Sequence, residues 1–152
     1  LAGEVLASQT FDVELDAVSH VGLPLAEEIV DYADAGNELV VATASDGAFA
    51  RVIFNPAEVI GQKLAAPAEA FETVASRVDG GVELKVTATS YVRDLFCMAD
   101  KIDAKASVDA GMVSLLPGES VTLRIDTGSD DDPQSFAAAN VLRSANDLKR
   151  EW

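Results

Sequence analysis

Apolar and polar residues alternate with a period of two along much of the chain, which is the spacing of half-buried β-strands. The clearest run covers residues 82–92. Its apolar side chains share one face and its polar side chains the other: Val82, Leu84, Val86, Ala88 and Val92 against Glu83, Lys85, Thr87, Thr89 and Tyr91. Residues 121–126 form a second such run. We expect both runs to be strands that contribute to one core, with these residues buried: Leu84, Val86, Val121, Leu123 and Ile125.

Residues 38–54 predict a β-hairpin, because Asp46-Gly47 lies between two apolar runs and Asp-Gly is a strong hairpin signal. Asn55-Pro56 should end the pairing, since proline cannot donate a ladder hydrogen bond. Two further strands are expected. One covers residues 5–15, where Val5, Ala7, Phe11, Val13 and Leu15 alternate with polar residues after allowing one irregular step, and the other covers residues 71–78.

Turn signals are frequent and helical spacing is rare. Asp79-Gly80-Gly81 precedes the run at 82–92, and Pro117-Gly118 suits a type II turn. Only residues 25–32 and 135–148 hint at helix. Many short strands with regular turns predict an all-β fold, an immunoglobulin-like antiparallel β-sandwich with short helical turns. The Cys…Trp…Cys pattern of antibody domains is absent, so the likeness concerns architecture alone.

The chain has 152 residues and is 49% hydrophobic, which suits one folded domain over residues 1–152. It begins with Leu1, and its first six residues read as a turn followed by a strand. We therefore expect a fragment of a larger protein that lacks one or more first strands. No apolar run approaches the ~20 residues needed to cross a bilayer, and no secretion signal is visible. These features favour a cytoplasmic location and no membrane partner.

The formal net charge is −15, from 26 acidic against 11 basic residues. Such a surface repels phosphate backbones, so nucleic-acid binding is not expected. Cys97 is the only cysteine and lies among Leu95, Phe96 and Met98. We interpret it as a buried, inert thiol.

No residue pattern indicates catalysis, a cofactor or a metal. His20 is the only histidine, which argues against a serine triad and the usual zinc sets. No pair of carboxylates stands in a motif typical of glycosidases. The acidic run at residues 129–132 lacks the glycine and closing glutamate of a calcium-binding EF-hand loop, so it is interpreted as an exposed loop. The expected sets of catalytic, cofactor-binding and metal-binding residues are therefore empty.

Three segments carry a resemblance to a known family: residues 38–64, residues 93–119 from Arg93-Asp94-Leu95-Phe96 to Leu116-Pro117-Gly118-Glu119, and Val141-Leu142-Arg143-Ser144-Ala145-Asn146-Asp147-Leu148. They resemble the C-terminal β-sandwich domain of bacterial β-mannosidases of glycoside hydrolase family 2. The resemblance implies a parent enzyme that hydrolyses terminal β-D-mannose residues with two glutamates of a separate barrel. No position here matches their motifs. The partner it implies is the catalytic barrel of the same parent chain, with a homo-oligomer as a second arrangement.

Two other readings of the sequence remain open. A carbohydrate-binding module would stack sugar rings on exposed aromatic side chains, and Tyr91 falls on the polar face of its predicted strand. Aromatic residues make up 6% of the chain, too few for an evident platform. Tyr91 would otherwise cover a sheet edge or pack against a neighbouring domain. A cell-surface adhesion module would occur as tandem copies behind a secretion signal.

Overall fold

The structure, a computed structural model, describes residues 1–148, and these residues form an all-β fold with short helical turns. The strands of the described part are β1 (Val40–Ala42), β2 (Val52–Phe54), β3 (Phe71–Val78), β4 (Gly81–Ala88), β5 (Val92–Cys97), β6 (Ser107–Val108), β7 (Val113–Leu115), β8 (Ser120–Asp126) and β9 (Leu142–Arg143). The helices are α1 (Glu27–Val30) and α2 (Pro67–Ala70), with 3₁₀ turns η1 (Val59–Gly61), η2 (Ala99–Lys101), η3 (Pro133–Ala137) and η4 (Ala145–Leu148).

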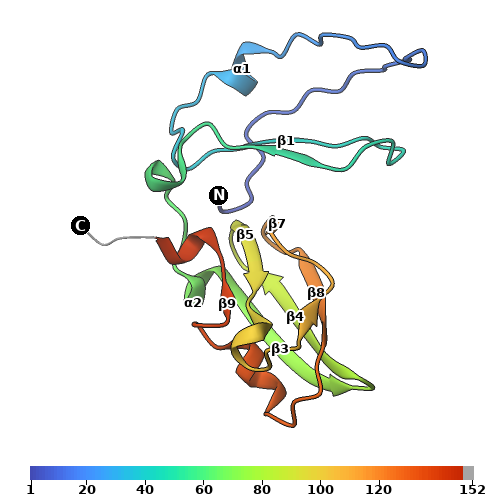
Figure 1. The fold of residues 1–152 in the computed structure, drawn as a ribbon. Helices are drawn as coiled ribbons and strands as arrows, with labels where there is room; N and C mark the ends of the chain where they lie inside the picture. The colour runs from blue at the N-terminus through green and yellow to red at the C-terminus, as the bar shows by residue number, and fades with distance from the viewer. Residues whose placement is uncertain (149–152) are drawn as a thin grey trace.

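Two of the antiparallel sheets face each other and form a β-sandwich. One sheet has the order β3-β4-β8-β6 and the other the order β7-β5-β9. The third sheet is the separate hairpin β1-β2. Figure 1 shows this hairpin and the segment before it projecting beyond one end of the sandwich. The expected antiparallel sandwich is confirmed.

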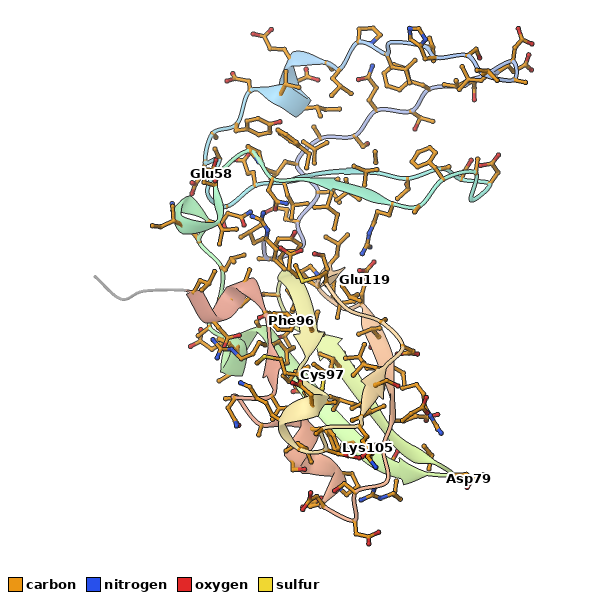
Figure 2. All side chains as sticks on the ribbon, viewed as in Figure 1. Glu58, Asp79, Phe96, Cys97, Lys105 and Glu119 are labelled. Carbon is orange, nitrogen blue, oxygen red and sulfur yellow. The ribbon has the colours of Figure 1, made fainter. Side chains whose placement is uncertain are left out.

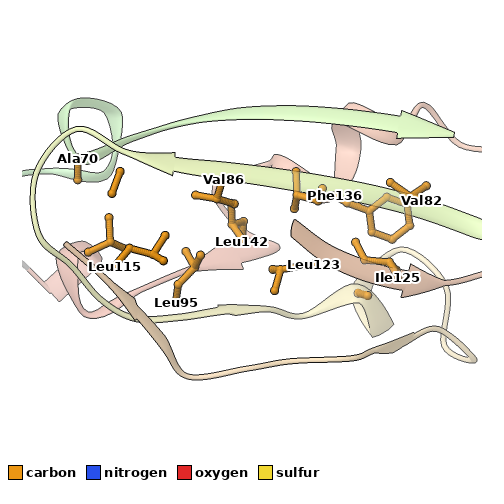
Figure 3. Close-up of a cluster of buried hydrophobic side chains, with 13 residues drawn as sticks. Ala70, Val82, Val86, Leu95, Leu115, Leu123, Ile125, Phe136 and Leu142 are labelled. Carbon is orange, nitrogen blue, oxygen red and sulfur yellow. The ribbon is translucent and has the colours of Figure 1, made fainter. Parts of the chain in front are cut away.

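The core lies between the two sheets and is continuous (Figure 3). The expected core residues Leu84, Val86, Leu123 and Ile125 are fully buried. Val121 is half-buried and packs against their edge. Leu84 pairs directly with Leu123 across β4 and β8, so the two period-two runs place their apolar faces in one layer.

Two expected turns form as the sequence indicates. Asp79-Gly80 joins β3 to β4 as a two-residue hairpin loop, with Gly80 at φ 74°. Gly118 has φ 86°, and the Glu119 N–H donates to the Leu116 carbonyl across Pro117-Gly118. Positive φ is accessible to glycine without the Cβ clash that other residues incur.

The prediction of a single strand over residues 82–92 is wrong at its C-terminal end. The strand β4 stops at Ala88, the N–H groups of Thr89 and Ser90 both donate to the Ala70 carbonyl, and the chain crosses to the other sheet. Val92 therefore begins β5, and Tyr91 lies at the crossing with 1% of its surface exposed. Period two alone cannot show where a chain changes sheet, because Val92 keeps the spacing of the buried residues of β4 although it belongs to the other sheet.

The strand expected over residues 5–15 does not form, since no described strand pairs with it. The helical spacing at residues 25–32 gives only the single turn α1. Residues 135–148 are not one helix but belong to η3, β9 and η4. The hairpin at residues 38–54 forms, but only three pairs of residues face each other across it, and a long loop replaces a tight Asp-Gly turn.

Burial divides the chain at Gln62. No residue from 1 to 61 is buried, whereas buried residues recur from Gln62 to Asn146. We call residues 4–61 the arm and residues 62–148 the sandwich. That residues 1–152 form one domain stays a prediction.

Candidate docking surface

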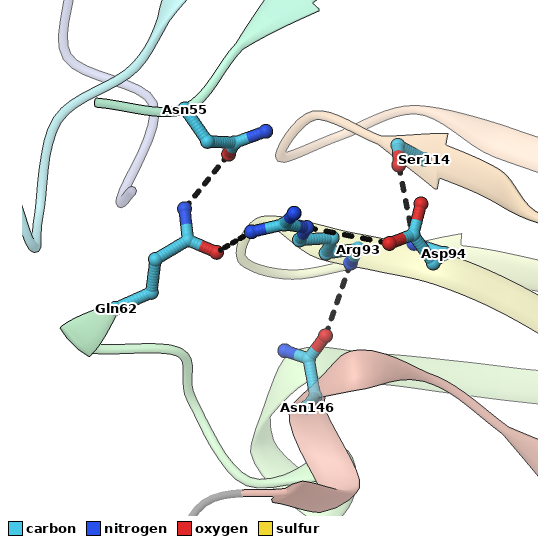
Figure 4. Close-up of polar contacts among 6 residues, drawn as sticks. All are labelled: Asn55, Gln62, Arg93, Asp94, Ser114 and Asn146. Carbon is cyan, nitrogen blue, oxygen red and sulfur yellow. Dashed lines mark hydrogen bonds and ion pairs between the residues drawn. The ribbon is translucent and has the colours of Figure 1, made fainter. Parts of the chain in front are cut away.

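A polar network fixes the base of the arm to the sandwich (Figure 4). The Gln62 side chain is 9% exposed; its Nε2 donates to Asn55 Oδ1 at 2.7 Å and its Oε1 accepts from Arg93 Nη1 at 2.5 Å. Arg93 Nε also lies 3.3 Å from Asp94 Oδ2. The chain from β2 is thereby bonded to β5 through one glutamine. Polar groups that are buried and paired in this way define a unique geometry.

Asn146 completes this network from the C-terminal side. Its side chain is fully buried, accepts from the Arg93 N–H at 3.0 Å and donates to the Ala65 and Tyr91 carbonyls, each at 3.0 Å. One amide therefore satisfies three backbone groups, two of them at residues 91–93 and one at Ala65. Because unpaired buried backbone groups are costly, Asn146 stabilises the crossing of the chain at Tyr91.

A small apolar cluster lies beside the network. Its buried members are Leu64, Tyr91 and Ala145, and five half-buried side chains pack on them: Leu1, Leu39, Ile53, Val59 and Leu116. Ile53 is a strand residue of the β1-β2 hairpin, so one face of the hairpin rests on the sandwich. Tyr91 is the largest of the three buried side chains of this cluster.

The hairpin loop is also tied to the sandwich by an ion pair. Arg51 donates to the Glu119 carboxylate and, at 2.9 Å, to the Ser114 carbonyl. Glu119, which Figure 2 shows at the end of the sandwich nearest the arm, accepts a further bond from the Leu116 N–H at 2.8 Å. Burial opposes the charged form of Glu119, but the bonds from Arg51 and Leu116 outweigh it and lower the pKa of this carboxyl.

The outward surface of the arm is apolar to an unusual degree. The described part of the chain exposes seventeen large apolar side chains, and fourteen of them belong to the arm. These are Val5, Leu6, Val13, Leu15, Val18, Val21, Leu23, Leu25, Val30, Val41, Phe49, Val52, Phe54 and Ile60. Scattered exposed apolar residues are normal, whereas such a concentration on one segment makes the arm the candidate docking surface.

The backbone of the arm is also open. Among the described residues, the stretch 4–25 makes one backbone–backbone hydrogen bond, from the Ser19 N–H to the Asp16 carbonyl. The Gln9 side chain accepts from the Ala26 N–H at 2.9 Å and so links the outgoing and returning limbs. An extended chain with unpaired N–H and C=O groups can accept a partner strand.

A shallow apolar hollow lies where the arm meets β5 and the C-terminal segment. Its volume is about 340 Å³, and Val59, Phe96, Met98, Met112 and Leu148 supply most of its lining. Asp94, which has φ 54° at the irregularity between Val92 and Leu95, is the one carboxylate among its described lining residues. A hollow with a mostly apolar lining suits an apolar side chain of a partner.

The residues that the sequence singled out as chemically notable do not come together. His20 and residues 129–132 lie in exposed loops far apart in sequence. Cys97, on β5 near the centre of the sandwich in Figure 2, is half-buried, and its Sγ lies 3.8 Å from the Phe136 carbonyl oxygen. Burial, aided by the charge of Asp100, raises the pKa of the Cys97 thiol to about 11, which disfavours the reactive thiolate.

Within residues 1–148, no three His, Cys, Asp or Glu side chains are grouped to bind a metal ion. Nor does that part of the chain contain a helix with the length and apolarity to span a bilayer.

Sequence reasoning missed the polar network. Arg93, Asp94 and Asn146 stood in the quoted motifs without a role, and Gln62 was not singled out. No periodicity marks them, because each acts through a contact between distant segments. The one available signal was the placement of polar residues beside strongly apolar runs.

Comparison of the sequence with known family models and with curated proteins finds no match in either.

Proposed function

We propose that the chain is a non-catalytic accessory β-sandwich that docks on another domain, and that the parent is a β-mannosidase-like glycoside hydrolase. The docking role is supported by one observation above all: a well-packed sandwich carries an arm with fourteen exposed large apolar side chains. The choice of parent rests on the resemblance of residues 38–64, 93–119 and 141–148. The parent would hydrolyse terminal β-D-mannose residues in its barrel.

The polar network gives this role a mechanism. An arm that bound a partner through a loose tether would lose rotational freedom and side-chain entropy on docking. The Gln62 side chain, bonded to both Asn55 and Arg93, and the Arg51–Glu119 pair instead hold the base of the arm at a fixed position on the sandwich. A pre-oriented arm can stiffen the barrel or complete the rim of its pocket with less loss of entropy. Interfaces between domains of one chain typically bury ~600–1,500 Å².

A stand-alone carbohydrate-binding module is less well supported. Its proposed platform, Tyr91, is 1% exposed and cannot stack against a sugar ring. Phe49 and Phe54 are about half exposed but belong to the apolar arm, without a polar network around them. No specific observation supports a cell-surface adhesion module.

The complete reading frame that encodes the chain tests the proposal. A barrel bearing two catalytic glutamates in the same frame is the expected result. Tandem β-sandwiches, or a barrel of another type, would contradict it. Turnover of an aryl β-mannoside is the matching assay: the whole parent should be active, and this chain alone should release no product. Activity of the chain alone that survives repurification and disappears on replacing one Asp or Glu would overturn the accessory role.

A further inference from the structure

The arm carries most of the molecule's charge imbalance. Residues 4–61 contain eleven acidic residues and one basic residue, Arg51, whereas residues 62–152 contain fifteen acidic and ten basic residues. Arg51 pairs with Glu119 of the sandwich, so it is not available to a partner. Nine of the arm's acidic residues are exposed: Glu4, Asp12, Glu14, Asp16, Glu27, Glu28, Asp31, Asp46 and Glu58.

The acidic and apolar side chains of the arm are interleaved along extended backbone. Val13 and Leu15 are 43% and 58% exposed on either side of Glu14. Val52 and Phe54 are 57% and 56% exposed at alternate positions of β2. Alternate residues of an extended chain point to the same side, so each run offers a short apolar stripe. In the first run the carboxylate of Glu14 lies between the two stripe residues in sequence and points to the other side.

Pairing in the arm is incomplete. The hairpin β1-β2 is a two-stranded sheet, and neither strand pairs with another described strand on its outer edge. Figure 1 shows the limbs of residues 4–38 running beside this hairpin at the end of the sandwich. A partner that adds a strand would satisfy the free N–H and C=O groups and cover the apolar stripe at once.

We propose that the arm binds a β-structured protein surface that is apolar at its centre and rich in Lys and Arg at its rim. A second copy of this chain fits poorly, because two arms with ten net negative charges each would meet within the ~8 Å screening length of physiological salt. Phosphate backbones and anionic lipid surfaces are repelled for the same reason. The proposal deepens the docking role and does not depend on which sugar the parent cleaves.

The test uses the complete chain and a synthetic peptide of alternating valine and lysine as the probe. Two peptides serve as controls: one of alternating valine and glutamate, and one with the same valines and lysines in two blocks. Fluorescence anisotropy of each labelled peptide gives the dissociation constants. We expect the alternating Val-Lys peptide to bind at least roughly tenfold more tightly than either control, and more weakly in about 0.5 M salt.

Matched variants locate the binding surface. Val52→Thr combined with Phe54→Thr should weaken binding of the Val-Lys peptide by roughly tenfold. Val74→Thr is the control, because Val74 is 66% exposed on β3, an edge strand of the sandwich. Circular dichroism checks that both variants keep the fold.

Three results would overturn the proposal. The first is equal binding of the block peptide, which would mean charge attraction without strand pairing. The others are an equal loss of peptide affinity in the Val74→Thr variant and a salt-stable dimer of the chain alone in sedimentation. None of these depends on finding a barrel in the reading frame. Failure of the parent assignment and failure of this inference are therefore distinguishable.

Discussion

At the scale of single residues, burial decides which positions carry the stability of the sandwich. Leu123 is fully buried next to Leu84 of the neighbouring strand and belongs to the core between the two sheets, so removing its side chain leaves a cavity there. We expect Leu123→Ala to lower the free energy of unfolding by ~2–5 kcal/mol in urea titrations. Val74→Ala, at an exposed site, should change it by less than ~0.5 kcal/mol. Similar losses at the two sites would show that the faces are assigned wrongly.

Gly81 tests packing of the backbone rather than of side chains. A Cβ at this position would lie 2.0 Å from the Ile125 carbonyl oxygen, inside the pairing of β4 with β8. We expect Gly81→Ala to destabilise the fold by ~1–3 kcal/mol or more in thermal unfolding, because the ladder must shift. Gly111→Ala is the control, since no atom lies within 4 Å of a Cβ there. An unchanged melting temperature for Gly81→Ala would refute the close approach.

The sequence predicted burial correctly at four positions within the two clearest period-two runs. The predicted core positions are buried, because each of their strands has one apolar and one polar face: Leu84, Val86, Leu123 and Ile125. Tyr91 was placed on a polar face, but it is buried because the chain changes sheets beside it. That crossing depends on Ala70 and Asn146, which lie far away in sequence.

At the scale of elements, Asn146 connects β5, the C-terminal turn and the segment before α2. Asn146→Ala would leave the Arg93 N–H and two carbonyls without their partners in the interior. We expect a loss of ~2–4 kcal/mol in the free energy of unfolding. Asn140→Ala, at an exposed turn, should have little effect. A loss below ~0.5 kcal/mol for Asn146→Ala would mean that water replaces the amide at no cost.

The ion pair between Arg51 and Glu119 makes the hairpin contact sensitive to acid. Because the folded pKa of Glu119 is lowered, its contribution is present above the unfolded pKa and is lost as pH falls through the folded pKa. The Glu119 side chain is 38% exposed, so solvent screening limits the contribution to ~0.2–1 kcal/mol.

Comparing Glu119→Gln with the unaltered chain over a range of pH measures this contribution. The difference in unfolding free energy should be largest near neutral pH and should disappear as pH falls through the folded pKa of Glu119, below which the carboxyl is protonated in both states. Glu72→Gln, on the exposed face of β3, is the control. A difference that stays constant with pH would show that the carboxylate charge does not act at this site.

The pairing of strands into sheets was harder to predict than the strands themselves. The runs at residues 71–78 and 121–126 are close to β3 and β8, and the two-residue turn at Asp79-Gly80 forms. The strand expected at residues 5–15 failed because a strand needs a neighbour, and none of the described residues supplies one. A period-two pattern predicts that one face of a segment is buried. It does not identify which strand, sheet or partner buries that face.

At the scale of the whole molecule, packing and charge are distributed unequally. The sandwich contains every buried residue of the described chain, and the arm contains most of the exposed large apolar side chains. The two parts are joined by specific contacts at Gln62, Tyr91 and Arg51. This arrangement holds an exposed apolar segment at a fixed position on a well-packed sandwich. Docking on another domain requires such a pre-oriented apolar surface.

Hydrogen exchange at the backbone amides tests this central claim most directly. In the chain alone, amides of residues 4–25 should exchange almost as fast as in an unfolded peptide, while those of β4 and β8 should be the slowest. In the proposed parent enzyme, the same arm amides should become protected. Arm amides as slow as those of β4 in the isolated chain, or unprotected in the parent, would contradict the account.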